Sequence, residues 1–181
     1  MTGTLELDRF VAGLQAVPLL DRPKAEIAAL LRDVCFSGLS LRKPLLSRAG
    51  SYTRTCAYRD DAFEVLLLNW APGAASPIHD HGGQYCWMAV LAGGLEVDDY
   101  ERLDSGERED SAMIAPRGRS VLHCGDLDLR SGRFDIHRVR ANGSSRALSL
   151  HVYARPLRRF LVYDEIAQRC QKALGVYDAS L

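Results

Sequence analysis

The first forty residues carry the hydrophobic pattern of two helices. Apolar residues recur at the spacing of one helix face at Leu7, Phe10, Val11 and Leu14, and again at Ile27, Leu30, Leu31 and Val34. Pro18 ends the first pattern. Asp21 suits an N-cap for the second helix and Pro23 suits its first turn, where no amide hydrogen is needed. We therefore expect residues 1–43 to form a mainly helical segment.

From residue 44 onward the pattern changes to short strands separated by turns. Seven segments are short and rich in β-branched or aromatic residues: 63–70, 84–93, 95–103, 110–116, 134–141, 147–154 and 160–164. Glycine- and proline-containing turn signals lie between them. Residues 164–174 are expected to form a short helix. The whole pattern indicates one domain over residues 1–181, with helices packed on an all-β antiparallel barrel or sandwich.

Composition and charge exclude several classes of protein. The 181 residues carry 23 basic and 23 acidic side chains, so no net charge favours nucleic acid or an anionic membrane. The N-terminus lacks the pattern of a signal peptide, and no apolar stretch is long enough to span a bilayer. We therefore expect a cytoplasmic monomer. The five scattered cysteines contain no CxxC pair, which argues against a disulfide framework and a cysteine-rich zinc site.

The histidines lie entirely in the strand-rich part of the chain. On a strand, His79 and His81 point to one face and Asp80 to the other, so both imidazoles can bind one metal ion. The alternative is two solvent-facing histidines on a loop. The surrounding spacing runs Gly73, five residues, His79-Asp80-His81, four residues, Cys86, six residues, Gly93. This spacing resembles the first motif of the cupins, which are antiparallel β-barrels of jelly-roll type, with Cys86 in place of their usual glutamate.

A third ligand must come from another strand. Gly132 and His137 resemble part of the second cupin motif, although alanine occupies position 141 where the family has asparagine. His123 is the alternative ligand, but its surroundings resemble no metal motif. Cys86 replaces the carboxylate, so three neutral imidazoles would leave the charge of a divalent ion unbalanced. Such a site favours an anionic ligand such as a thiolate, with open positions left for O2.

Four segments between residues 51 and 156 resemble the cysteine dioxygenase family, in the family's order. They are SYTRT, SPIHDHGGQYCWMAVLAGGLE, FDIHRV and SLHVYARP. The resemblance implies one Fe(II) per chain on His79, His81 and His137, and conversion of a thiol and O2 into a sulfinic acid.

The resemblance also implies roles for two residues near position 53. Arg54 would hold the substrate carboxylate, because a guanidinium matches it with two parallel hydrogen bonds. Tyr52 would flank that carboxylate. From the residues alone, the two share one strand face, and an ordinary surface arginine is the alternative interpretation.

Ser149, His151 and Tyr153 alternate along one strand. From the pattern alone, their face could simply point to water. The resemblance instead places it inside the barrel, with Tyr153 near the iron and with His151 and Ser149 orienting its hydroxyl. Cys86 and Tyr153 match the pair that some family members join by a thioether bond.

The function expected is that of an Fe(II)-dependent dioxygenase that converts L-cysteine into cysteine sulfinic acid. Relatives that act on 3-mercaptopropionate typically carry glutamine in place of the arginine, so Arg54 favours cysteine. Another carboxylated thiol, such as 3-mercaptopropionate or mercaptosuccinate, remains an alternative, whereas cysteamine lacks a carboxylate for Arg54. A non-catalytic cupin that binds a small ligand, or a cupin enzyme that uses zinc, nickel or manganese, would also fit the fold, because a fold does not by itself determine function.

Overall fold

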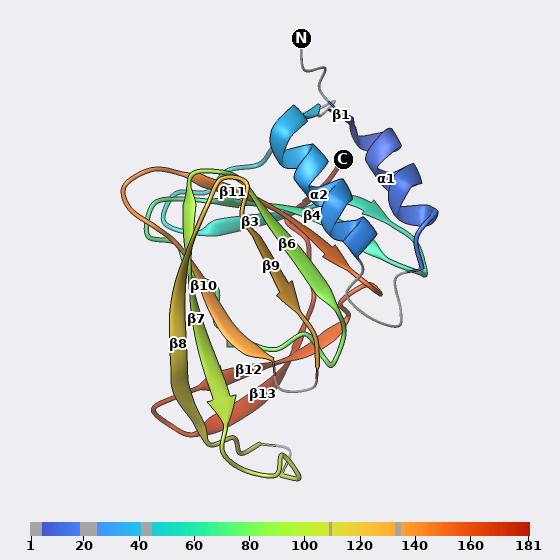
Figure 1. Cartoon of the computed structure of the whole chain (residues 1–181). Coiled ribbons are helices and arrows are strands. Elements are labelled where there is room, and N and C mark those ends of the chain that lie inside the picture. Colours follow the sequence, from blue (N-terminus) through green and yellow to red (C-terminus); the bar gives the residue numbers. More distant parts are fainter. Residues whose placement is uncertain (1–4, 19–24, 41–44, 109, 133–134) are drawn as a thin grey trace.

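Two six-stranded sheets face each other, and two helices cover one of them (Figure 1). The computed structural model describes the chain except for residues 1–4, 19–24, 41–44, 109 and 133–134. The helices are α1 (Leu7–Gln15) and α2 (Ala25–Ser37), flanked by a two-stranded pair of β1 (Leu5–Glu6) and β2 (Leu39–Ser40). Both predicted helices are confirmed, whereas Asp21 and Pro23 lie outside the described residues.

Sheet I has the strand order β14-β3-β4-β11-β6-β9. Its strands are β3 (Tyr52–Arg59), β4 (Glu64–Trp70), β6 (Cys86–Ala92), β9 (Leu127–Arg130), β11 (Ala147–Tyr153) and β14 (Ala179–Ser180). Sheet II has the order β13-β12-β5-β10-β7-β8. Its strands are β5 (Ile78–His79), β7 (Gly94–Arg102), β8 (Ile114–His123), β10 (Ile136–Ala141), β12 (Arg159–Asp164) and β13 (Arg169–Leu174).

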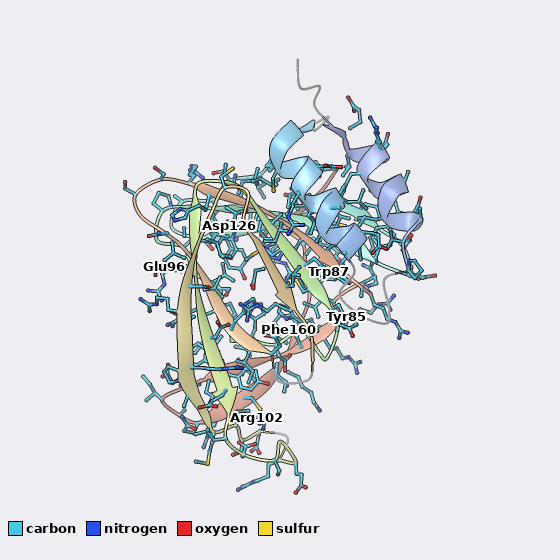
Figure 2. All side chains as sticks on the ribbon, in the orientation of Figure 1. Tyr85, Trp87, Glu96, Arg102, Asp126 and Phe160 are labelled. Carbon is cyan, nitrogen blue, oxygen red and sulfur yellow. The ribbon has the colours of Figure 1, made fainter. Side chains whose placement is uncertain are left out.

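The helices explain why β4 reads as a continuous apolar run. Phe10, Leu14, Ile27 and Leu31 pack against the outer face of sheet I, where they meet Val65 and Leu67 of β4 and Trp87 of β6. Figure 2 labels Trp87, which lies beneath these helices. The inner face of β4 contributes Leu66, Leu68 and Trp70 to a second apolar cluster between the two sheets. Because both faces of β4 are covered, the strand does not alternate between apolar and polar residues.

The architecture is that of a jelly roll, as expected, but it is not a closed barrel. Among the described residues, no strand pairing joins sheet I to sheet II. Most pairs are antiparallel, and β14 lies parallel to β3. No helix in the described part of the chain has the length and apolar character needed to cross a membrane.

Two predicted elements differ from the structure. The prediction of a helix over residues 164–174 is wrong, because β12 and β13 form an antiparallel hairpin there. Gln168 lies in the turn of this hairpin, with φ 52°. The strand expected over residues 110–116 begins at Ile114 instead and runs to His123. That strand is mostly exposed and lies at the edge of sheet II, so it lacks the apolar alternation that marks a half-buried strand.

Candidate metal centre

Three histidines meet on the inner side of sheet II. His79 ends β5, His81 follows two residues later, and His137 of β10 lies directly across from His79 in the antiparallel register. One ligand nitrogen from each imidazole lies within 4.8 Å of the other two. Within the described residues this is the only group of three metal-binding side chains at such distances. His123 is exposed at the end of β8 and is not part of it.

Asp80 holds the turn between His79 and His81. The strand expected through both histidines stops at His79, and the Asp80 carboxylate is buried. It accepts hydrogen bonds from the Gly82 amide at 3.0 Å, the Leu161 amide at 2.9 Å and the Tyr163 hydroxyl at 2.8 Å. These bonds fasten the turn to β12. The sequence pattern predicted that Asp80 points away from the metal, but it did not predict these hydrogen-bond partners.

Gly82 is required by the same turn. Its φ is +60°, and a Cβ at this position would lie 2.7 Å from the Arg159 carbonyl oxygen. A side chain would therefore force the turn away from β12.

The imidazoles are in the form that binds metal ions. Desolvation is the main cause that lowers the pKa of His79 to about 4, and it lowers the pKa of His81 and His137 well below the usual value. The Pro77 carbonyl lies 2.9 Å from His79 Nδ1 and can only accept, so the proton is on Nδ1 and Nε2 keeps its lone pair. In His81 and His137, the buried Nδ1 atoms have no hydrogen-bond partner in the described part of the chain. Three close, neutral imidazoles therefore suit a divalent transition metal.

Cys86 and Tyr153 lie side by side on the inner face of sheet I. They are directly paired across β6 and β11, and both are buried. Each side chain is close enough to shift the pKa of the other. Burial raises the pKa of both groups, so thiol and phenol are neutral in the metal-free protein. The Tyr153 ring centroid is 5.9 Å from that of His81, which places the pair beside the histidines.

A chain of hydrogen bonds fixes the orientation of His151. The Trp70 indole donates to Ser149 Oγ at 2.9 Å, and Ser149 Oγ lies 2.9 Å from His151 Nε2. An indole can only donate, so the serine hydroxyl accepts from it and is free to donate to Nε2. The other ring nitrogen, Nδ1, faces Cys86 Sγ at 4.0 Å. The nitrogens of His151 thus face Ser149 and Cys86, whereas the resemblance implied that His151 orients the hydroxyl of Tyr153.

Arg54 reaches the same space from β3. Its Nε and Nη2 atoms are buried and have no hydrogen-bond partner among the residues that the structure describes. These two atoms form one edge of the guanidinium, the edge that matches a carboxylate. Tyr52 stacks on Trp70 with ring centroids 4.6 Å apart. The residues predicted around the substrate are thus brought together with the three histidines.

A cavity of about 40 Å³ lies between these groups. Its lining comprises Tyr52, Arg54, Leu68, Trp70, Ser76, Pro77, His79, His81, His137, Val139, His151, Tyr153, Leu157 and Phe160. The Phe160 ring, labelled in Figure 2, lies 5.9 Å from the ring of His79. Among the described residues that line it, Arg54 is the one cation, and none is a carboxylate. A larger groove of about 740 Å³ is formed by residues around the β12–β13 turn and includes none of the histidines.

A partly buried ionic cluster lies beside His137. Arg130 of β9 binds Asp128 at 2.7 Å, Asp135 at 3.1 Å and Asp99. Asp128 Oδ2 is 3.9 Å from His137 Nδ1. Burial raises the pKa of Asp128, and the adjacent Arg130 opposes this. Sequence reasoning missed the cluster, because its members come from two separate strands, β9 and β7, and from the segment before β10.

Comparison with known proteins gives a family match over most of the strand-rich part. The family model of cysteine dioxygenase type I matches residues 48–166. Cysteine dioxygenase type 1 of Danio rerio is 29% identical over 116 residues, and that of Homo sapiens is 27% identical. In both alignments 63% of this chain is covered, and the chain spans 56% of the relative's length.

Solved structures align more distantly. A protein with a double-stranded β-helix domain from Klebsiella pneumoniae aligns with a TM-score of 0.48 and 15% identity, over 66% of this chain and 90% of that one.

Proposed function

The chain belongs to the cysteine dioxygenase type I family, and on that premise we propose that it is an Fe(II)-dependent thiol dioxygenase. Its substrate is a small carboxylated thiol, with L-cysteine as the first candidate, and its product is the sulfinic acid. One observation carries the proposal. The unpartnered edge of Arg54 and the three neutral histidines line the same small cavity.

The three imidazoles fit a divalent iron. His79, His81 and His137 would hold it, and its chemistry would be to bind the thiolate and to activate O2. Because all three ligands are neutral, the site favours an anionic fourth ligand, and a coordinated thiol gives up its proton. The protein's own contribution is to orient the substrate and to exclude water from the cavity.

Arg54 would orient the substrate through its carboxylate. Buried donors without partners cost about 1–3 kcal/mol each, so the Nε–Nη2 edge favours a ligand that accepts two hydrogen bonds. With a single cation in the lining, one carboxylate is matched and a second is not. This favours L-cysteine or 3-mercaptopropionate over mercaptosuccinate.

The substrate's amino group distinguishes L-cysteine from 3-mercaptopropionate. The described residues that line the cavity include no carboxylate, so they offer no counter-charge to an ammonium group. L-Cysteine therefore depends on its amine binding to the metal, whereas 3-mercaptopropionate needs only its thiolate and carboxylate. This makes 3-mercaptopropionate the second candidate substrate.

We also propose that Cys86 and Tyr153 form a thioether during turnover. The bond would join Sγ to the ring carbon beside the Tyr153 hydroxyl. Two hydrogens leave the protein, and O2 accepts them with their electrons. The direct cross-strand pairing of these two buried side chains supports this proposal.

The direct test loads the protein with Fe(II) without oxygen and then measures O2 uptake with a panel of thiols. The panel contains L-cysteine, 3-mercaptopropionate, mercaptosuccinate and cysteamine, and mass spectrometry identifies the products. We expect thiol-dependent uptake and a sulfinate with a carboxylated thiol. His137→Ala should abolish both iron retention and uptake, whereas His123→Ala, its matched control, should preserve them. No thiol-dependent uptake by the iron-loaded protein would contradict the proposal.

A further inference from the structure

Strand β9 brings two charged side chains to the inner face of sheet I. It pairs with β6 so that Arg130 lies across from Cys86, and Asp128 across from Met88. Both charged side chains are largely buried, with 11% exposure for Arg130 and 15% for Asp128. Burying an ion costs free energy, and pairing offsets only part of that cost. A role at the adjacent metal site would explain why these two charged side chains are buried there.

Asp128 of this cluster approaches a metal ligand, His137. Its Oδ2 accepts a hydrogen bond from Arg130 Nε at 2.7 Å and lies 3.9 Å from His137 Nδ1. That ring nitrogen is buried, and no described residue forms a hydrogen bond with it. A movement of about 1 Å would bring the two atoms to hydrogen-bonding distance. By contrast, Asp135 binds Arg130 and the Ser131 amide.

The charge of the cluster complements that of the metal site. Three carboxylates share one guanidinium, so the cluster carries a formal excess of negative charge. The three neutral imidazoles bring no negative charge to the metal site. Cys86 stands where most cupins have a glutamate, so that carboxylate is missing as well. A carboxylate is therefore present behind a ligand instead of on the metal. Such carboxylate–histidine pairs fix the ring's tautomer and strengthen it as a ligand.

We propose that Asp128 is a positioning residue for His137. Its carboxylate accepts the Nδ1 hydrogen, directs Nε2 at the metal and offsets part of the ion's charge, while Arg130 holds the carboxylate in place. The inference rests on the proposed metal centre and adds a residue that the family motif does not contain.

The test measures metal affinity, without turnover. Anaerobic titration of the metal-free protein with Co(II), followed through its visible absorption and against a competing chelator, gives the Kd. We expect Asp128→Asn to weaken binding by about 10- to 100-fold. Asp135→Asn removes another carboxylate charge that is paired with Arg130, but not the one that faces His137. Its Kd for Co(II) should stay within about threefold of that of the native protein. Thermal unfolding establishes that each variant is folded.

A second variant separates charge from packing. Asp128→Glu keeps the carboxylate, so we expect it to bind Co(II) more tightly than Asp128→Asn. Equal losses in Asp128→Asn and Asp135→Asn would overturn the proposal, as would native affinity in Asp128→Asn or equal affinities in the Glu and Asn variants. If His137→Ala binds Co(II) as tightly as the native protein, the metal centre itself is wrong, and the role of Asp128 is wrong with it.

Discussion

Replacing Arg54 tests how the cavity recognises its substrate. In the free protein, Nε and Nη2 have no partner in the described part of the chain, so Arg54→Ala breaks no hydrogen bond that these atoms make there. If Arg54 binds the substrate carboxylate as proposed, the same change removes two charge-assisted hydrogen bonds from the substrate complex. The loss should therefore appear when a carboxylated thiol binds and should be small for a thiol without a carboxylate.

The size of the effect follows from the two donors. Arg54 is only partly buried, so we take about 1.5 kcal/mol for each charge-assisted bond, at the lower end of the usual range. Two bonds give about 3 kcal/mol, which corresponds to roughly a 150-fold loss in kcat/KM. Arg54→Lys keeps the charge but loses the two-pronged geometry, so we expect a loss of about tenfold.

The assay compares L-cysteine and 3-mercaptopropionate with cysteamine on each iron-loaded variant, by O2 uptake over a range of substrate concentrations. We expect the loss with the carboxylated thiols to exceed the loss with cysteamine by about two orders of magnitude in Arg54→Ala. Most of it should appear in KM, because the carboxylate is bound before and during the reaction. Equal losses on all three thiols would refute the role of Arg54 in carboxylate binding.

Three further predictions follow from the same geometry. After aerobic turnover, the intact mass of the native protein should show a species that lacks two hydrogens, lost from the Cys86–Tyr153 pair, and Cys86→Ser should not show this species. If all of the native protein keeps its unmodified mass, the crosslink is contradicted. Tyr163→Phe removes the 2.8 Å bond to the buried Asp80 carboxylate and should lower the free energy of unfolding by about 2 kcal/mol in chemical denaturation; an unchanged value would show that this bond does not stabilise the turn. The pKa of His79 is about 4 in the folded state, below its ordinary 6.5, so the unfolded state takes up a proton first as the pH falls. The melting temperature of the metal-free protein should therefore drop between about pH 6.5 and 4, and His79→Gln should reduce that drop. The same pH dependence of the melting temperature in the native protein and in the variant would contradict this prediction.

Local patterns predicted those parts of the site that lie close together in the sequence. His79 and His81 are separated by one residue, and a fixed spacing around them is enough to suggest a metal site. His137 is different, because it reaches the site through the pairing of β10 with β5, a contact between distant segments. Its identification in the sequence depended on the family resemblance.

The features that sequence reasoning missed depend on tertiary pairing. Asp128 and Arg130 lie on a four-residue strand without apolar alternation, and their partners come from β7 and the segment before β10. Residues 164–174 contain apolar side chains four apart at Ile166, Cys170 and Leu174, a spacing that also suits a helix. Pairing with β12 overrides that local pattern and leaves Ile166 exposed in the turn.

Isotopic labelling tests the central claim most directly. The Fe(II)-loaded protein is given its best thiol substrate under ¹⁸O₂, and the mass of the product is measured. A thiol dioxygenase transfers both atoms of O2 to sulfur, so we expect a sulfinate that carries two ¹⁸O atoms, formed by the native protein and not by His137→Ala. A disulfide as the sole product, or a sulfinate without label, would contradict the account.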